Sequence, residues 1–221
     1  MLLAVDTSTT QVGIALYDGA QVVGEFAWRS NRRHTVELAP AISDLLSRCG
    51  KSMDDVTALG VALGPGSFTS LRVGLALVKG LALSKQIPII GVPTLDILAH
   101  AQPSSELPLA VAIQAGRSRF ALGWYKSSKE GWQAQGGERI ATLDELDADV
   151  QSPSIVCGEF SLEERQQLSD NENIRLMAPS LSVRRPAILA ELAWAGWKAG
   201  DVDDPASLAP IYLHTDGSLP A

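Results

Sequence analysis

The stretch LGPGSFTSLRVGLALVKGLAL, residues 63–83, joins a glycine-rich turn to a helix that has almost no polar face. Free backbone N–H groups and the helix dipole meet at a helix N-terminus, so a turn of this kind can hold phosphate. A helix that is apolar nearly all round must be covered on more than one side. The stretch therefore raises two hypotheses, a nucleotide site and a surface for another protein.

The turn does not match the common phosphate-binding motifs. Gly64-Pro65-Gly66 begins like a dinucleotide fingerprint, but Thr69 takes the place of the third glycine. No acidic residue follows about 20 positions later to hold a ribose. A P-loop lysine is followed by Ser or Thr, whereas Lys79 precedes another glycine. The motifs favour a structural turn that begins a helix.

The helix after the turn is apolar on more than one side. Leu71, Leu75 and Val78 line one side, and Val73, Leu77 and Leu81 line another. Ser70 and Gly74 are small residues at positions i and i+4, which allows a second helix to approach closely. The helix is either buried by its own fold or presents an apolar face to a partner, since large exposed apolar patches usually mark interfaces.

Hydrophobic patterning predicts the same order of elements twice along the chain. In the first half, strands are expected over residues 2–5, 12–16, 22–28, 58–62 and 89–92, with helices over 38–49 and 67–83. In the second half, strands are expected over 109–113, 120–125, 132–136 and 155–157. Helices are expected over 142–146 and 187–198, and a capping box at Ser161 predicts the start of another helix between them. We expect an α/β duplicated fold of two related lobes, residues 1–103 and 104–221, each with a mixed sheet flanked by helices.

Composition excludes several classes of protein. The 18 Lys and Arg residues face 25 Asp and Glu residues, a net charge of −7, which argues against independent nucleic-acid binding. No apolar stretch approaches the roughly 20 residues of a membrane span. The N-terminus lacks the basic start and cleavage site of a signal peptide, so a cytoplasmic location is expected.

Candidate catalytic groups are few. Asp6, Thr7 and Ser8 follow the first strand, where a carboxylate and hydroxyls either hold a metal-bound phosphate or satisfy a turn. The three histidines form no H-x-x-x-H or H-E-x-x-H pair, and no G-x-S-x-G elbow is present. Arg184-Arg185 is a small basic pair that either touches phosphate or is solvated. The residues predict no catalytic group and no metal ligand.

Four segments together carry a family resemblance. They are LLAVDTSTTQVGIALYDG (2–19), RRHTVELAPAISDLL (32–46), GVALGPGSFTSLRVGLALVKGLAL (60–83) and PIIGVPTLDILA (88–99). The chain resembles the TsaB family, formerly YeaZ, of the bacterial tRNA threonylcarbamoyladenosine machinery. The resemblance is weaker beyond residue 100, where RPAILAELAWAGWKAG and LAPIYLH look like the family's last helix and C-terminal signature.

The resemblance implies an actin/Hsp70-like (ASKHA) fold and a non-catalytic role. In that family the subunit pairs with its catalytic paralogue TsaD, which transfers the threonylcarbamoyl group to the adenosine beside the anticodon, and the ATPase TsaE joins the complex. The implied partners are therefore a TsaD-like paralogue, a TsaE-like ATPase, and a second copy of the chain in a homodimer when the paralogue is absent. Contact with tRNA is expected only through the complex.

The resemblance also assigns residues to sites. The family pairs through helices that match residues 35–49 and 67–83, which makes the predicted partner interface Leu38, Ile42, Leu45, Ser70, Leu71, Gly74, Leu75 and Val78. Candidates for a vestigial nucleotide site are Asp6, Thr7, Ser8, Gly64 and Gly66. No histidine stands within residues 92–98, where the paralogue holds its metal. No cofactor is implied, and weak ATP or ADP binding stays open.

Two rival hypotheses remain. The first is an enzyme of the same fold, either ATP-dependent and kinase-like or metallopeptidase-like. Asp6 and the Gly-Pro-Gly turn favour it, while Gln114, which stands where the family pattern has an aspartate, and the unpaired histidines oppose it. The second is a small module that senses nucleotide without hydrolysing it.

Overall fold

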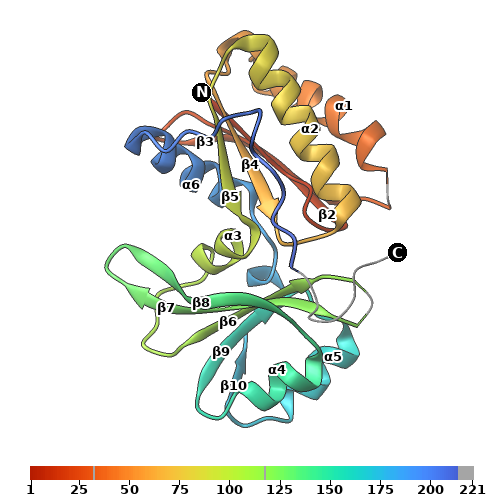
Figure 1. Cartoon of the computed structure of the whole chain (residues 1–221), viewed down its shortest axis with the longest axis vertical. Helices are drawn as coiled ribbons and strands as arrows, with labels where there is room; N and C mark the ends of the chain where they lie inside the picture. The colour runs from red at the N-terminus through yellow and green to blue at the C-terminus, as the bar shows by residue number, and fades with distance from the viewer. Residues whose placement is uncertain (32, 117, 214–221) are drawn as a thin grey trace. The chain divides into compact units, whose positions relative to one another are not determined.

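The computed structural model describes residues 1–31, 33–116 and 118–213, which divide into two compact units (Figure 1). The first unit is Met1–Ile97 with Arg184–Ile211, and the second is Leu98–Val183 with residues 212 and 213. No helix among the described residues is long and apolar enough to cross a membrane.

The first unit is a mixed sheet with helices on both faces. Its strands are β1 (Leu2–Asp6), β2 (Gln11–Tyr17), β3 (Val22–Arg29), β4 (Ala58–Gly64) and β5 (Ile89–Pro93), in the order β3-β2-β1-β4-β5. The meander β1-β2-β3 is antiparallel, and β4 lies parallel to β1 and β5. The helices are α1 (His34–Arg48), α2 (Phe68–Lys85) and α6 (Pro186–Ala199), with the short 3-10 helix η1 (Met53–Asp55). Helix α3 (Thr94–His100) begins in this unit, and its residues from Leu98 on belong to the second.

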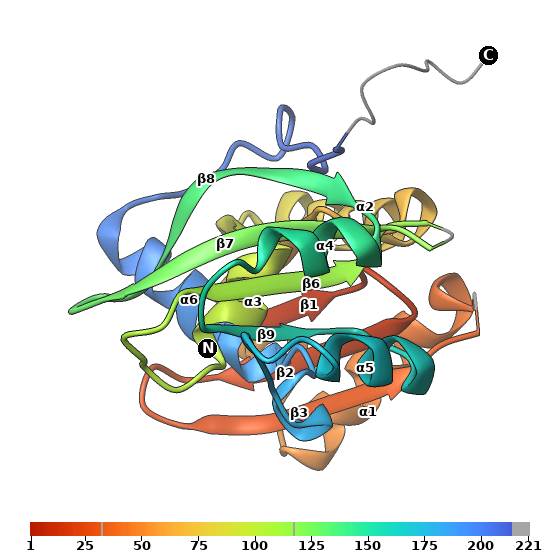
Figure 2. The ribbon, with the colours of Figure 1, turned by 90° about the horizontal axis from the view of Figure 1, so that it is seen from below.

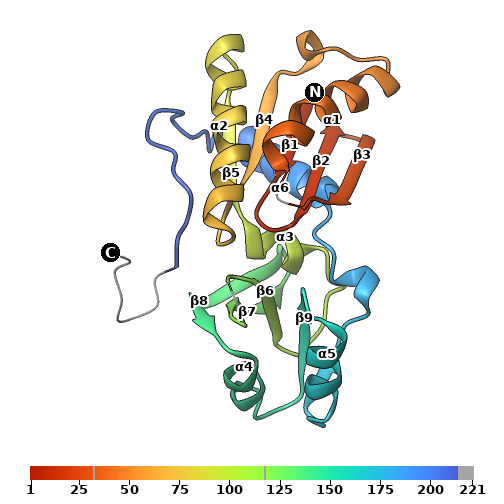
Figure 3. The ribbon, with the colours of Figure 1, turned by 90° about the vertical axis from the view of Figure 1, so that its right-hand side faces the viewer.

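Strand alternation explains why both faces of this sheet need covering. Leu3 and Val5 of β1 pack with the core side chains of α1 and α2. Leu2 and Ala4, which point to the opposite face, pack with α6. Figure 3 shows α1 and α2 on one face of the sheet and α6 on the other. The continuous apolar run at the start of the chain is thus a strand that is buried on both faces.

The second unit repeats the plan of the first. Its elements are β6 (Leu109–Gln114), β7 (Phe120–Ser128), β8 (Gly131–Ala141), α4 (Leu143–Asp149), β9 (Ser154–Gly158), α5 (Leu162–Ser169), β10 (Ile174–Leu176) and the 3-10 helix η2 (Pro179–Leu181). When β6 to β10 are matched in chain order with β1 to β5, the strand order β10-β9-β6-β7-β8 is the same as that of the first unit, read from the other edge. Helices α4 and α5 cover the same face of this sheet (Figure 2). The predicted capping box at Ser161 is present, since Glu164 N donates to its hydroxyl. The shared plan confirms the prediction of two related halves.

The observed units differ from the predicted lobes at the C-terminal end. The prediction placed all of residues 104–221 in one lobe, but residues 184–211 return to the first unit. Leu189, Ala190 and Ala193 of α6 are completely buried against its sheet. The helix returns because the face of this sheet opposite α1 and α2 is apolar and needs a cover.

Candidate functional site

The candidate nucleotide-binding residues lie where β1 ends and the chain turns toward β2. Asp6 is 2% exposed, and both of its carboxylate oxygens accept hydrogen bonds. Oδ1 accepts from the backbone N–H of Ser8 at 2.8 Å. Oδ2 accepts from Nε of Arg184 at 2.8 Å. The carboxylate is therefore held by an internal ion pair and by its own turn.

Arg184 is the charged residue that the sequence analysis did not assign to this site. Its side chain has no exposed surface. Besides pairing with Asp6, its Nη2 donates to Oγ1 of Thr9 at 3.0 Å and to the carbonyl of Gln11 at 3.1 Å. The alternatives considered for the Arg184-Arg185 pair, phosphate contact or solvation, are wrong for Arg184. A pair between residues 178 positions apart leaves no local signal in the sequence.

Hydrogen bonds join the rest of this turn to the start of α2. Thr7 Oγ1 donates to the carbonyl of Ser70 at 2.8 Å, and the carbonyl of Ser8 accepts from the N–H of Ser67 at 2.7 Å. Gly66 lies so close to the Ser8 carbonyl that an added Cβ would be 2.3 Å from its oxygen. A residue with any side chain would collide there, so the glycine is needed for this close approach.

Thr94, at the start of α3, completes the contacts. Its Oγ1 accepts from the N–H of Gly64 at 2.9 Å and shares a 2.8 Å hydrogen bond with Ser8 Oγ. The structure thus brings Asp6, Ser8, Gly64 and the Gly66 turn into one hydrogen-bonded cluster. Among the residues that the structure describes, no three His, Cys, Asp or Glu side chains are grouped so that they could hold a metal ion.

The predicted partner-interface residues lie in the core and not on the surface. Leu38, Ile42 and Leu45 of α1, together with Leu71, Leu75 and Val78 of α2, are at most 5% exposed. Ser70 and Gly74 are buried as well. These side chains therefore belong to the core of the unit, and of the eight only Leu38 and Ile42 also line cavities between α1 and α2. Helical periodicity identifies the most apolar face of a helix, and in both helices that face packs on the unit's own sheet.

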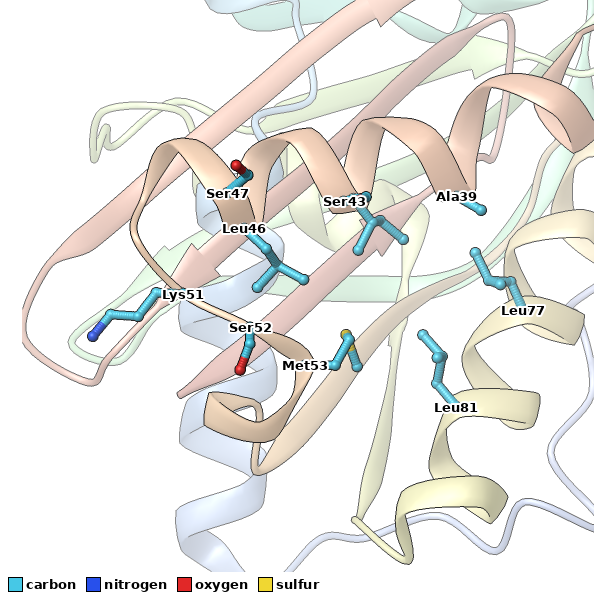
Figure 4. Close-up of a pocket in the computed structure, with 10 residues that line it drawn as sticks. Ala39, Ser43, Leu46, Ser47, Lys51, Ser52, Met53, Leu77 and Leu81 are labelled. Atoms are coloured by element: carbon cyan, nitrogen blue, oxygen red, sulfur yellow. The ribbon is translucent and has the colours of Figure 1, made fainter.

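The outward sides of α1 and α2 form an apolar groove. Two adjoining cavities, of about 480 and 450 Å³, both include Ala39 of α1 and Leu77 of α2 in their lining. In the first cavity Leu46, Met53, Leu77 and Leu81 point toward one another, while Lys51 points away (Figure 4). The second cavity is lined by His34, Thr35, Leu38, Ala39, Phe68, Thr69, Arg72, Val73, Ala76 and Leu77. We call these two cavities the α1–α2 groove.

Large exposed apolar side chains accompany the groove on both helices. Val36 of α1 is 58% exposed, and Phe68 and Leu83 of α2 are 52% and 68% exposed. The guanidinium of Arg72 lies 3.7 Å from the centre of the Phe68 ring, which keeps a cation over the aromatic face. These residues were missed because they fall outside the stripe that helical periodicity selects. Their signal in the sequence was the apolar character of α2 on more than one side.

Polar contacts near the start of α1 fix the neighbouring edge of the sheet. The indole N–H of Trp28 on β3 donates to Glu37 Oε2 at 3.1 Å, and this hydrogen bond lowers the pKa of the Glu37 carboxyl. Arg185 forms a bidentate pair with Glu25 on the same strand. Unlike the Arg184 pair, the Arg185 pair is at the surface, with the arginine side chain 58% exposed.

Comparison with known proteins gives consistent matches. The family model for TsaD, tRNA N6-adenosine threonylcarbamoyltransferase, matches residues 22–182. The tRNA threonylcarbamoyladenosine biosynthesis protein TsaB of Bacillus subtilis is 30% identical over 217 residues, which cover 96% of this chain and 93% of that protein. The TsaB protein of Escherichia coli is 32% identical over 142 residues, covering 63% of this chain and 61% of that protein.

A solved structure agrees with these relatives. YeaZ from Pseudomonas aeruginosa superposes with a TM-score of 0.77 at 26% identity and covers 96% of this chain and 99% of that one. Together with the repeated plan of the two units, this match confirms the predicted duplicated α/β fold of the actin/Hsp70-like type.

Proposed function

The chain belongs to the TsaB (YeaZ) family, and from this premise we propose that it is a non-catalytic subunit in the biosynthesis of threonylcarbamoyladenosine in tRNA. Its task is to pair with a catalytic TsaD-like paralogue, which carries out the transfer to the adenosine next to the anticodon. A TsaE-like ATPase joins the pair, and tRNA contacts the chain only through the complex.

The observation that carries this proposal is the α1–α2 groove. Its walls are mainly apolar, and Phe68, which lines it, is 52% exposed. Leu83 of α2 is 68% exposed, and Val36 of α1, 58% exposed, lines the neighbouring cavity between α1 and β3. Single exposed apolar residues are common, but a groove with several of them along two neighbouring helices is typical of a protein interface. A helix pair from another chain fits such a groove with its apolar ridge between α1 and α2.

The state of Asp6 supports a non-catalytic role over the kinase-like alternative. A carboxylate that positions a metal-bound phosphate needs an oxygen that the metal or its waters can reach, so it must be exposed to the site. Here one oxygen accepts from Arg184 and the other from the backbone of Ser8, at 2% exposure. Release of the carboxylate would leave the Arg184 guanidinium buried without its counter-charge, which is strongly unfavourable.

The match to the TsaD family model supports a related fold in the partner. Two chains with the same α1–α2 arrangement can pair through equivalent faces, because a surface that complements itself also complements a close relative. The same reasoning predicts a homodimer when the paralogue is absent. In that homodimer the groove is occupied by the groove of a second copy.

The test measures threonylcarbamoyl transfer to tRNA by the TsaD-like protein of the same genome, with the carbamoyl-adenylate donor and the TsaE-like ATPase supplied. We expect transfer to depend on this chain, and the chain alone to transfer nothing. If the chain is dispensable, or if it modifies tRNA or hydrolyses ATP alone, the proposal is wrong.

A variant pair locates the interface. Ala39→Arg places a long charged side chain at the residue that both cavities share. Ala195→Arg makes the same change at an exposed position of α6, which packs on the opposite face of the sheet. We expect Ala39→Arg to raise the concentration of chain needed for half-maximal transfer by roughly tenfold or more, as central interface residues do. Ala195→Arg should leave it unchanged.

A further inference from the structure

Both helices of the proposed docking groove are attached at their first turns to the same short segment, Asp6–Thr10. We propose that Arg184 is a positioning residue for the groove: it holds this segment in place, and the segment in turn sets where α1 and α2 begin. This inference rests on the proposed function, because it assigns the groove as the partner's binding surface.

The first step is the attachment of Arg184 to the segment. Its guanidinium reaches the carboxylate of Asp6, the hydroxyl of Thr9 and the carbonyl of Gln11 at distances of 2.8, 3.0 and 3.1 Å. These groups precede, belong to and follow the turn between β1 and β2. The rigid fork of an arginine can bind several acceptors at once, which a lysine ammonium on a flexible stem does less well. Arg184 therefore holds both ends of the turn.

The second step joins the turn to α2. Thr7 donates to the carbonyl of Ser70, and Ser67 donates its N–H to the carbonyl of Ser8. One turn further on, Gly74 contacts the Thr7 side chain so closely that a Cβ there would lie 2.3 Å from Oγ1. Three successive contacts along α2 thus depend on the position of Thr7 and Ser8.

The third step joins the turn to α1. His34, the first residue of α1, is 5% exposed and its Nε2 lies 3.0 Å from the carbonyl of Thr9. The N–H of Ser30, which directly follows β3, donates to the carbonyl of Thr10 at 2.7 Å. His34 also lines the same cavity of the groove as Phe68. The separation of the two helices at this end of the groove therefore follows from the geometry of the turn.

The energetics favour a role in geometry over one in stability. A buried ion pair gains little net stability over well-packed apolar residues, because both charges lose their hydration. Removal of one partner alone is costly, since it leaves an uncompensated buried charge. If both partners are replaced by apolar residues, the chain can still fold, but the hydrogen bonds from Arg184 that hold the turn between β1 and β2 are lost.

The experiment compares three variants of the full chain. In the double variant Asp6→Leu with Arg184→Met, both charges are removed. In Arg184→Lys the charge that pairs with Asp6 is kept and the fork is lost. Arg185→Met is the matched control, because Arg185 is the adjacent arginine, its side chain is 58% exposed, and its ion pair is with Glu25 of β3 and not with the turn.

Two measurements separate positioning from folding. Folding is followed by circular dichroism and thermal unfolding, and hydrogen exchange reports on residues 34–38 and 68–72. The concentration of chain that half-saturates transfer by the TsaD-like protein reports on the groove. For the double variant we expect a folded chain, faster exchange in those two first turns, and a half-saturating concentration roughly tenfold higher at an unchanged maximal rate. For Arg184→Lys we expect exchange rates and a half-saturating concentration between those of the double variant and the unchanged chain. Arg185→Met should match the unchanged chain in both.

The outcomes distinguish this inference from the proposed function. If Ala39→Arg weakens pairing while the double variant and Arg184→Lys pair normally, the groove is the binding surface and Arg184 does not position it. If Ala39→Arg has no effect, the groove is not the binding surface and this inference fails with it, whereas the proposed function fails only if transfer does not depend on the chain. If the double variant does not fold, Arg184→Lys decides: a half-saturating concentration that rises only in proportion to the unfolded fraction, with unchanged exchange in the two first turns of the folded chain, means a purely structural role and overturns the inference.

Discussion

Thr7 and Gly74 touch where the turn after β1 meets the second turn of α2, and only a residue without a side chain fits at position 74. An added Cβ would lie 2.3 Å from Thr7 Oγ1 and 3.1 Å from Thr7 Cγ2. The small residues at i and i+4 in this helix were expected to admit a second helix. At Gly74 the close neighbour is a side chain of the same unit.

This contact predicts opposite effects for two glycines of one helix. Gly74→Ala should lower the free energy of unfolding by about 1–3 kcal/mol, because Thr7 is anchored to Ser70 and cannot move away freely. Gly80→Ala should raise it by about 0.5–1 kcal/mol, since an added Cβ meets nothing within 4 Å and alanine favours the helix. Urea unfolding of both variants measures the difference. Equal effects would mean that the two helix positions are equivalent.

A charge at Leu75 tests the burial of the predicted interface residues. If Leu75 faced a partner, as the family resemblance implies, Leu75→Glu would abolish pairing and leave the fold partly intact. Because Leu75 is 5% exposed in the core beneath α2, we now expect the variant to unfold, at a cost of about 4 kcal/mol or more. Circular dichroism at increasing temperature is the measurement. If the variant stays folded and its thermal unfolding midpoint is unchanged, Leu75 lies at the surface and not in the core.

The exposed apolar side of α2 predicts a separation of pairing from stability. Leu83 and Leu162 are both exposed leucines, at 68% and 71%, but Leu83 is on α2 beside the groove and Leu162 is the first residue of α5 in the other unit. Leu83→Asp should weaken binding of the TsaD-like protein severalfold, and Leu162→Asp should not. Both variants should unfold like the unchanged chain. Titration calorimetry supplies the affinities, and equal affinities for the two would argue against this side of α2.

The internal pairing of Asp6 predicts a weak response to nucleotide. A ligand at a hundred times its dissociation constant stabilises a protein by about 2.7 kcal/mol. Because Asp6 is bonded to Arg184 and to its own turn, we expect magnesium and ATP together to leave the unfolding midpoint unchanged. A clear rise that Asp6→Asn removes would instead support a working nucleotide site and the nucleotide-sensing alternative.

The sequence by itself determined the order and type of most elements and the repeat, although the short strand β10 was not predicted. Strands, helices and the capping box at Ser161 are local features, set by side-chain period and by hydrogen bonds within a few residues, so they can be read along the chain. The four segments within residues 2–99 together also indicated the family, which the relatives confirm.

Only the tertiary structure decided which surfaces are available. Periodicity marks Leu38, Leu71 and their neighbours as the most apolar faces but does not say whether a sheet or a partner covers them. The return of α6 to the first unit and the pairing of Arg184 with Asp6 join residues far apart in sequence. Such contacts are selected by the burial of apolar area and of charge in the whole fold, and a local pattern carries no information about them.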